Sequence, residues 1–354
     1  MRLPLTYRYA PMEARSVDTL PVGQLWQYEP KWDGFRCLAF RNGATVELRS
    51  KAGRSLSRYF PELVELLGTV TAKTFVLDGE IIVPDGAVSS FDALLQRIHP
   101  AQSRVRRLAT ETPAIYIVFD LLVDDRNRSL TQLPLATRRD KLEAFVQRFT
   151  RASAISRSIR LSPATTAVRT ARRWLSGREG LDGVVAKRVD LPYQSGERTG
   201  MEKVKRIRTV DCVVGGFRYA SNQHVIGSLL LGLYDGTGLL HHVGFTSSLS
   251  VAERKALVPK LERLIKAPGF TGQAPGGPSR WSTKRSSEWE PLAPTLVVEV
   301  TYDHFSGNRF RHGTHLLRWR PDKKPRQCTI DQVELSGRSA LRSLLRPKSG
   351  MRSC

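Results

Sequence analysis

Short apolar segments separated by turn signals constrain the fold of this chain more than any other feature of its sequence. The segment CLAFRNGATVELRS has two strand-like halves joined by Asn42-Gly43, the strongest short signal for a β-hairpin. TFVLDGEIIVPDGAV is a second hairpin candidate, with its turn at Pro84-Asp85-Gly86. AIYIVFDLLV and LDGVVAKRVD are typical of further strands. We therefore expect a strand-rich domain in the first two hundred residues, with a few helices between the strands.

Several helices are predicted between and after these strands. Pro61 opens a short helix over PELVELLGTV, because proline suits the first helical turn. Helices over Thr137–Phe149 and Thr166–Leu175 follow, and Gly177 is placed to end the second of them. The pattern over Val251–Lys266 predicts one more helix.

The pattern of expected elements changes near Arg206–Thr209, from strands mixed with several helices to mostly short strands. Beyond this point CVVGGFRY, SLLLGLYDGTGLLHHVGF and TLVVEVTYDHF are strand-like. Short strands with a single helix suit a small β-barrel of the oligonucleotide-binding (OB) kind. The tail SGRSALRSLLRPKSGMRSC is basic and weakly patterned, so we expect it to be disordered. We therefore divide the chain into domains 1–206 and 207–335 and a tail, 336–354.

The charge of the chain indicates its partner. The 56 Lys and Arg residues against 33 Asp and Glu give a net charge of +23, which favours a polyanion or an anionic membrane surface. No apolar stretch approaches the roughly 20 residues that span a bilayer, and the N-terminus lacks the pattern of a secretory signal. Four scattered cysteines suggest reduced thiols. We expect a cytoplasmic protein that binds nucleic acid and no membrane.

Lys31 lies in QYEPKWDGFRCLAF, directly before an apolar run, with Glu29 and Asp33 on either side. A lysine is a nucleophile only when it is neutral, and its ordinary pKa of about 10.4 keeps it charged near pH 7. Neighbouring carboxylates raise that pKa further. These acids therefore oppose activation unless a metal or an anionic substrate rebalances the site. Taken alone, the pattern is more typical of a lysine paired with a carboxylate at the end of a strand.

Other strands carry charged residues at their ends in the same way. VLDGEIIV places Asp78 and Glu80 at an apolar strand, and LDGVVAKR places Asp182 and Lys187 at another. Carboxylates that converge at one edge of a sheet repel and raise one another's pKa. A bound divalent cation would offset this repulsion, so the pattern suggests a metal site. MEKVKRIR places Lys203 and Lys205 two residues apart, and therefore on the same face of a strand. Two ammonium groups side by side need an anion such as phosphate between them.

In this order, the motifs resemble those of the ATP-dependent DNA ligases, within the covalent nucleotidyltransferases, and are most similar to the short bacterial ligases. KWDGFR resembles the nucleotidyl-lysine motif, LRSKAGR the DNA-contacting motif and LDGEIIV the third motif. YIVFDLL, LDGVVAKR, MEKVKR and RWRPDKKP resemble the remaining motifs, and SFDALLQRIHP resembles the helix after the third. The resemblance runs from about Pro11 to Asp331.

The resemblance implies an α+β nucleotidyltransferase domain of antiparallel sheets with flanking helices, followed by an OB-fold β-barrel. The implied activity is the sealing of 5′-phosphate/3′-hydroxyl nicks in duplex DNA, in DNA repair. Lys31 would attack the α-phosphorus of ATP and become AMP-lysine. Residues implied to bind the nucleotide are Glu29 at adenine, Phe119 stacked on the base, Arg36 and Glu80 at the ribose, and Lys203 and Lys205 at the α-phosphate.

The resemblance also implies a metal, DNA contacts and a second group of catalytic residues. The metal would be Mg²⁺, with Mn²⁺ possible, held by Asp182 and Glu80. The 5′-phosphate of a nick would meet Ser50 and Lys51. The departing pyrophosphate would be oriented by residues of the barrel, namely Arg320, Asp322 and Lys323.

Three positions depart from the family pattern. Asp182 stands where Glu is usual, and its shorter side chain would reach the metal through water. Glu179 is a less favoured alternative, because its spacing to Lys187 is wrong. Met201 replaces a usual Trp, which removes an aromatic wall. Lys51 replaces a usual Arg, so two parallel N–H donors that would bind a phosphate together are replaced by a single ammonium group.

Two alternatives remain open. Another covalent nucleotidyltransferase, either an RNA ligase or an mRNA guanylyltransferase, would share the lysine and the barrel. A catalytically inactive nucleic-acid-binding protein would keep the scaffold but would need neither Lys31 nor the segment at Arg320–Lys323.

For the ligase, we expect a monomer that contacts nicked duplex DNA mainly at its backbone. A hinge at Arg206–Thr209 would let the barrel close over ATP and then clamp the duplex.

Overall fold

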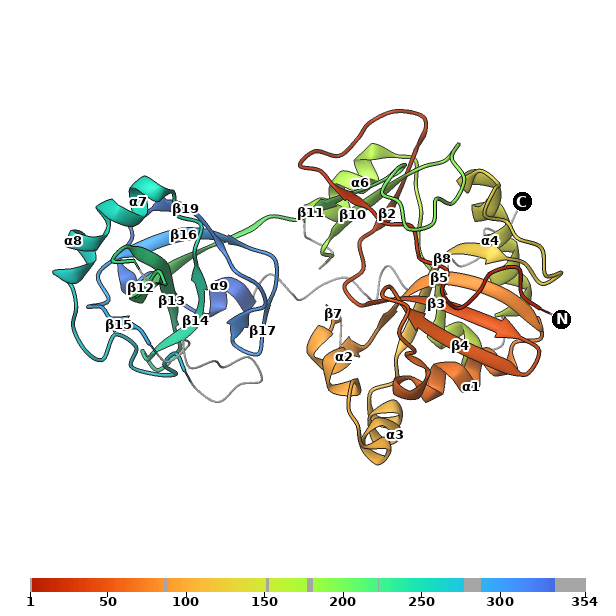
Figure 1. Ribbon diagram of the computed structural model, residues 1–354, viewed down its shortest axis with the longest axis horizontal. Coiled ribbons are helices and arrows are strands. Elements are labelled where there is room, and N and C mark those ends of the chain that lie inside the picture. Colours follow the sequence, from red (N-terminus) through yellow and green to blue (C-terminus); the bar gives the residue numbers. More distant parts are fainter. Residues whose placement is uncertain are drawn as a thin grey trace, which may run out of the picture. The chain divides into compact units, whose positions relative to one another are not determined.

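The computed structural model describes residues 2–85, 88–150, 153–176, 181–221, 223–276 and 288–334. The described residues form two compact units, one ending at Arg206 and the other beginning at Ile207 (Figure 1). The expected tail over 336–354 and the helix-ending Gly177 lie outside the described residues. In the part of the chain that is described, no helix combines the length and the apolar character needed to cross a bilayer.

The larger sheet of the first unit has five strands in the order β4-β3-β5-β8-β9. Their bounds are Phe35–Asn42 (β3), Thr45–Ser50 (β4), Thr74–Ile82 (β5), Ile115–Val123 (β8) and Ile159–Leu161 (β9). The predicted hairpin at Asn42-Gly43 is confirmed, because β3 and β4 pair antiparallel with Asn42 opposite Thr45.

The second predicted hairpin is wrong in its extent. Both edges of β5 are occupied, by β3 and by β8, so β5 has no free edge for the residues that follow Pro84. The hairpin is reduced to two short strands, β6 (Pro84–Asp85) and β7 (Val88–Ser89), which pair antiparallel.

The smaller sheet of the first unit has the strand order β1-β11-β10-β2. Its strands are Arg15–Ser16 (β1), Trp26–Pro30 (β2), Gly183–Arg188 (β10) and Met201–Lys205 (β11). In the central strand, Val185 lies opposite both Glu29 and Lys203. Because side chains alternate between the two faces of a strand, one face carries every second residue of β2, β10 and β11. This face forms one wall of the site described below.

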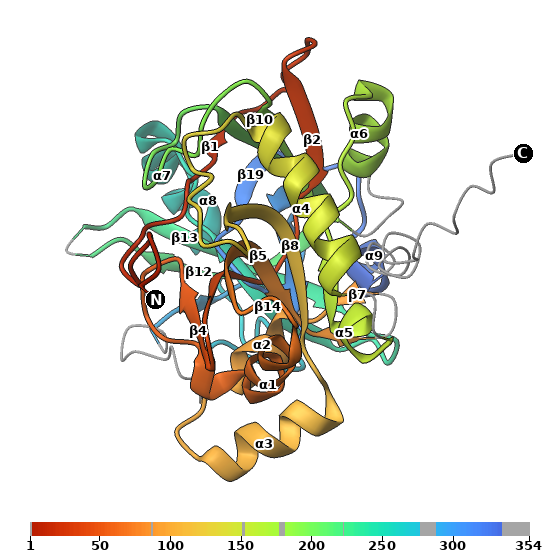
Figure 2. The same ribbon diagram turned by 90° about the vertical axis from the view of Figure 1, so that its right-hand side faces the viewer.

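Helices pack around the two sheets (Figure 2). The first unit contains α1 (Pro61–Thr69), α2 (Phe91–Arg97), α3 (Gln102–Glu111), α4 (Leu135–Phe149), α5 (Ser153–Ser158) and α6 (Val168–Leu175). The start at Pro61 is confirmed, and α4 and α6 lie where helices were predicted. Ser90 caps α2, since its Oγ accepts a hydrogen bond from the Ala93 N–H at 3.2 Å. The longest of these helices, α4, lies along β8 and buries Leu142 and Phe145.

The second unit is a β-barrel with the main strand order β14-β13-β12-β16-β19. Its strands are Arg208–Tyr219 (β12), Ile226–Tyr234 (β13), Leu240–Thr246 (β14), Glu290–Pro291 (β15), Val297–Tyr302 (β16), Phe305–Ser306 (β17), Arg309–Phe310 (β18) and His315–Trp319 (β19). A bridge between Thr246 and Thr314 joins the end of β14 to the start of β19 and closes the row. The arrangement is the OB-fold barrel that the sequence predicts.

The predicted helix over Val251–Lys266 is wrong as a single element. The segment forms two short helices, α7 (Val251–Ala256) and α8 (Val258–Glu262). Pro259 lies in the first turn of α8, where its missing N–H costs nothing, whereas in the middle of one long helix it would break the ladder. The last helix among the described residues, α9, spans Asp331–Glu334.

His242, on β14, is a buried titratable residue in the barrel, with 6% of its surface exposed. Burial, together with the smaller effect of the nearby cations Arg309 and Arg218, lowers its pKa to about 3. The unfolded chain takes up this proton near pH 6.5. Between these values the unfolded state binds more protons than the folded state, so stability falls as the pH falls. We expect acidification from pH 7 to pH 5 to cost about 2 kcal/mol of unfolding free energy through this residue.

Denaturant unfolding of the wild type and of His242→Gln at both pH values measures this contribution. The variant is expected to lose about 2 kcal/mol less than the wild type on acidification. His224→Gln is the matched control, because the His224 side chain is 61% exposed, and it should follow the wild type. Equal losses in the wild type and in His242→Gln would contradict the prediction.

Candidate active site

Lys31 lies in the loop between β2 and β3, which belong to different sheets. Its backbone N–H donates to the carbonyl oxygen of Gly183 at 2.9 Å, and its ammonium forms an ion pair with Asp182. Gly183 has φ +152°, and a Cβ there would come within 2.1 Å of the Val204 carbonyl oxygen. Only glycine fits this position. The close approach of the chain at Gly183 therefore brings Asp182 to the Lys31 ammonium.

The carboxylates around Lys31 oppose its activation, as the sequence suggested. Burial favours the neutral amine, but Asp182, Asp33 and Glu80 outweigh it and raise the pKa of Lys31 above its ordinary value. Burial also raises the pKa of Glu80 to about 7, although Arg36 and Lys31 pull it down. The protein's own side chains therefore keep Lys31 charged near neutral pH. A cation bound by these carboxylates would remove part of that opposition.

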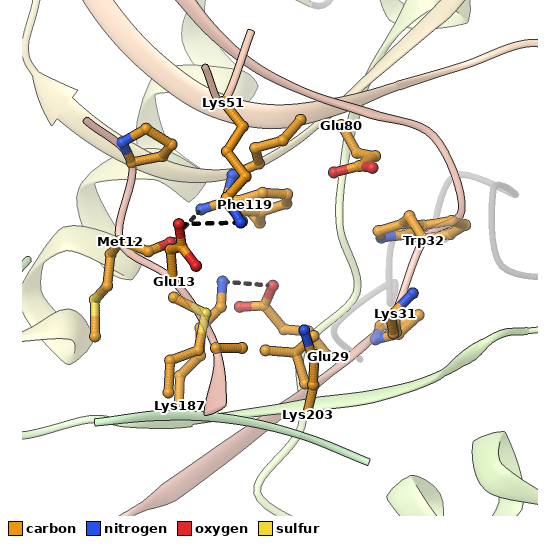
Figure 3. A pocket seen from close by; sticks show the side chains of 16 residues that line it. Met12, Glu13, Glu29, Lys31, Trp32, Lys51, Glu80, Phe119, Lys187 and Lys203 are labelled. Carbon is orange, nitrogen blue, oxygen red and sulfur yellow. Dashed lines mark hydrogen bonds and ion pairs between the residues drawn. The ribbon is translucent and has the colours of Figure 1, made fainter. Parts of the chain in front are cut away.

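A cavity of about 180 Å³ lies beside Lys31, between the two sheets of the first unit (Figure 3). Seven of the residues implied by the family resemblance line it: Glu29, Lys31, Arg36, Lys51, Glu80, Phe119 and Lys203. Ser50 and Lys205 are not among its lining residues, and Lys205 is exposed. Asp182 reaches the site through its ion pair with Lys31.

Several cations line the cavity, Lys51 and Lys203 among them. Lys203 lies on the same face of β11 as Lys205, and burial together with Lys31 and Lys205 lowers its pKa. Lys51 forms an ion pair with Glu13 at 3.0 Å and is 57% exposed. Ammonium groups in this number are compatible with a bound anion such as a phosphate. The cavity thus offers an anionic ligand several cations and a mainly apolar wall that includes Phe119 and Val185.

Glu29 is held by two neighbours whose role was not deduced from the sequence. The Lys187 Nζ donates to one Glu29 oxygen at 2.9 Å (Figure 3). The Gln27 amide donates to the other at 3.0 Å. Glu29 is 2% exposed and Lys187 is 6% exposed. The same ammonium lies 4.4 Å from the centroid of the Phe119 ring. Lys187 shares its strand face with Val185, so the period-two spacing in LDGVVAKR would have placed it in the cavity.

Arg36 is also fixed by two residues, Asp78 and Tyr193, that were not among the predicted nucleotide-binding residues. It lies opposite Glu80 in the β3–β5 register, and its guanidinium binds both oxygens of the fully buried Asp78, each at 2.6 Å. Tyr193 donates to the same carboxylate at 2.6 Å. The guanidinium carbon lies 4.5 Å from the centroid of the Phe119 ring. Asp78 and Tyr193 thus fix Arg36 against the aromatic wall.

The residues assigned to pyrophosphate lie together in the second unit, directly after β19. Arg320 binds Asp322 through Nε at 2.9 Å and through a terminal nitrogen at 2.8 Å. Its other terminal nitrogen donates to Asp211 at 2.9 Å, and the Lys323 Nζ lies 3.0 Å from the second Asp211 oxygen. The structure thus adds Asp211, on β12, to this group.

Comparison with known proteins places this site in a family. Residues 11–205 match the family model of the ATP dependent DNA ligase domain, and residues 222–323 match that of the ATP dependent DNA ligase C terminal region. DNA ligase C2 of Mycolicibacterium smegmatis is 43% identical over 353 residues, which cover 94% of this chain and 96% of that protein. DNA ligase C of Mycobacterium tuberculosis is 44% identical over 352 residues, with the same two coverages.

The fold alone is also similar to that of a solved Lig E DNA ligase. That comparison gives a TM-score of 0.53 at 16% identity and covers 88% of this chain and 99% of the other. The two family models and the two mycobacterial relatives span nearly the whole chain. The chain therefore belongs to the ATP-dependent DNA ligases.

Proposed function

We propose that this ligase seals nicks with a 5′-phosphate and a 3′-hydroxyl in duplex DNA and carries AMP on Lys31. The observation that carries the proposal is the position of Lys31 in the wall of the cavity. Glu29 and Phe119 line the same cavity, as do the cations Lys51 and Lys203. A nucleotide has a flat base and an anionic phosphate chain, so its site needs an aromatic surface for the base and cations for the phosphates.

The reaction is three phosphoryl transfers. The Lys31 amine first attacks the α-phosphorus of ATP, so that a P–N bond forms, pyrophosphate leaves and the amine loses a proton. The 5′-phosphate of the nick next attacks the same phosphorus, which breaks the P–N bond. The 3′-hydroxyl finally attacks the 5′-phosphate and releases AMP. Each transfer depends on alignment and charge neutralisation more than on an acid or base from the protein.

The residues implied by the family resemblance have distinct roles in this proposal. Glu29 accepts a hydrogen bond from the adenine amino group, and Phe119 stacks on the base. The remaining contacts are Arg36 and Glu80 at the ribose, Lys203 and Lys205 at the α-phosphate, Ser50 and Lys51 at the 5′-phosphate of the nick, and Arg320, Asp322 and Lys323 at the pyrophosphate.

The carboxylates beside Lys31 fit a divalent cation. Carboxylate oxygens are ligands that Mg²⁺ and Mn²⁺ accept, and Asp182 and Glu80 both act on the Lys31 ammonium. We propose that these two residues hold Mg²⁺. The bound metal would supply positive charge to phosphate oxygens. Glu179, the alternative acid, lies outside the described residues.

The net charge of +23 supports a largely sequence-independent grip on the DNA backbone. We propose that the enzyme acts as a monomer in the cytoplasm, at the nucleoid, and that its nick sealing serves DNA repair.

Mass spectrometry of the protein after incubation with ATP and Mg²⁺ tests the proposal. We expect one added AMP, on the peptide that contains Lys31. Parallel incubations with α-labelled ATP and GTP should label the protein from ATP alone. Label from GTP would favour the guanylyltransferase alternative. No label from either nucleotide would favour an inactive binding protein, and AMP on another side chain would contradict the role of Lys31.

A further inference from the structure

The barrel places two acids side by side. Asp211 on β12 lies directly opposite Glu299 on β16 in the antiparallel register. Like charges in this position repel, so an isolated pair would weaken the sheet. Arg320 compensates, because its terminal nitrogen lies 2.9 Å from an Asp211 oxygen and 3.7 Å from a Glu299 oxygen. Glu299 has its own closer partner in Arg318, at 2.7 Å.

Asp211 is the residue that contacts both of the cationic side chains assigned to pyrophosphate, Arg320 and Lys323. One of its oxygens accepts from Arg320 and the other lies 3.0 Å from the Lys323 Nζ. The carboxylate is largely buried, with 11% of its side chain exposed, and so is the Arg320 side chain, at 17%. Asp322 holds the opposite edge of the guanidinium. Arg320 is therefore fixed on two sides, unlike an arginine in a single exposed ion pair.

The hydrogen bonds of this group leave donors for a ligand. An arginine has five N–H groups, and the bonds to Asp322 and Asp211 use three of those of Arg320. An ammonium has three N–H groups, and the ion pair with Asp211 engages one of those of Lys323. Two donors on each side chain remain, and both side chains are anchored to one carboxylate. Such a pair suits an anion with several oxygens, since each remaining donor is already oriented.

We propose that Asp211 is a positioning residue for the first step of ligation. It holds Arg320 and Lys323 side by side, so that their remaining N–H groups meet the oxygens of the departing pyrophosphate together. Without Asp211 the two cations would repel each other and separate. The inference rests on the proposed pyrophosphate role of Arg320 and Lys323 and adds the residue that aligns them.

Two assays separate this role from a general structural one. The first measures lysyl-AMP formation in a single turnover with α-labelled ATP and Mg²⁺. The second measures sealing, without ATP, of a nicked duplex whose 5′-phosphate already carries AMP, which bypasses the first step. We expect Asp211→Asn to slow lysyl-AMP formation by roughly 10- to 100-fold. The reverse reaction, in which added pyrophosphate removes AMP from the lysine, should slow by the same factor. Sealing of the adenylylated nick should stay within about threefold of the wild type.

Glu299→Gln is the matched control. It removes the same charge from the opposite strand position but leaves the Asp211 hydrogen bond from Arg320 and its ion pair with Lys323 in place, so lysyl-AMP formation should stay within about threefold of the wild type. If thermal unfolding shows that Asp211→Asn does not fold, Asp211→Glu replaces it. That variant keeps the charge, moves the carboxylate by one methylene and should show the same selective loss of the first step.

Other results of these assays would show which part of the inference is wrong. Equal losses in the two assays for the Asp211 variants would make Asp211 a structural residue and overturn the inference. Normal lysyl-AMP formation by Asp211→Asn, alongside slow formation by Arg320→Ala, would also overturn it while leaving the pyrophosphate role intact. Normal lysyl-AMP formation by Arg320→Ala would instead refute the pyrophosphate role on which the inference rests.

Discussion

Lys31→Ala is expected to abolish ATP-dependent nick sealing, with a loss of at least about a thousandfold in rate. The reason is that the first transfer needs an amine at this point of the cavity wall, and alanine has none. The variant should still seal part of a substrate whose 5′-phosphate already carries AMP, because that step makes no bond to the lysine. Gel assays of labelled nicked duplexes, with ATP or with the adenylylated substrate, measure both rates.

Lys255→Ala is the matched control for this experiment. It makes the same substitution on the exposed surface of α7, far in sequence from the motifs, and should seal at the wild-type rate. Lys203 also lines the cavity and its pKa is lowered, so it is the amine best placed to replace Lys31. ATP-dependent sealing by Lys31→Ala, or AMP attached to Lys203, would show that the chemistry had been assigned to the wrong residue.

Lys187→Met is expected to lower the free energy of unfolding by about 3 to 5 kcal/mol, because it leaves the Glu29 carboxylate buried without its cation. Glu29 and Lys187 are 2% and 6% exposed, so water does not replace the lost partner. Denaturant unfolding at pH 7 measures the loss. The double variant Glu29→Gln with Lys187→Met should recover most of it, since no charge then remains buried at this point.

The control substitution is Lys51→Met, in the ion pair with Glu13. This lysine is 57% exposed, so the same change should cost less than about 1 kcal/mol. A similar small loss for Lys187→Met would mean that the ion pair with Glu29 contributes little to stability. A double variant no more stable than Lys187→Met would attribute the loss to packing of the lysine stem rather than to charge.

Local sequence signals predicted much of this fold. The hairpin at Asn42-Gly43 and the helix start at Pro61 depend on neighbours in the chain, and the structure has both. Pro259 was a local signal too, and weighing it would have divided the helix predicted over Val251–Lys266. The pairing of β5 on both edges was not predictable in this way, because it depends on strands distant in sequence.

The same distinction applies to the site. The motif residues Glu29, Lys31 and Phe119 line one cavity, and motif order was enough to select them. Their supporting partners were missed. Lys187 is separated from Glu29 by 158 positions, and Tyr193 from Asp78 by 115. A periodic pattern tells which face of a strand a side chain occupies, but it does not tell which distant acid that side chain will meet.

The alternation along β2, β10 and β11 limits how the gene for this enzyme is able to vary. Loss or gain of one codon early in β10 would exchange the faces of the residues that follow it, so that Ala186 would turn toward the cavity and Lys187 away from it. Single amino-acid replacements in these strands change one contact, whereas a frame-preserving deletion changes every contact of the strand residues that follow it. Active descendants should therefore conserve the length of these strands more strictly than their composition.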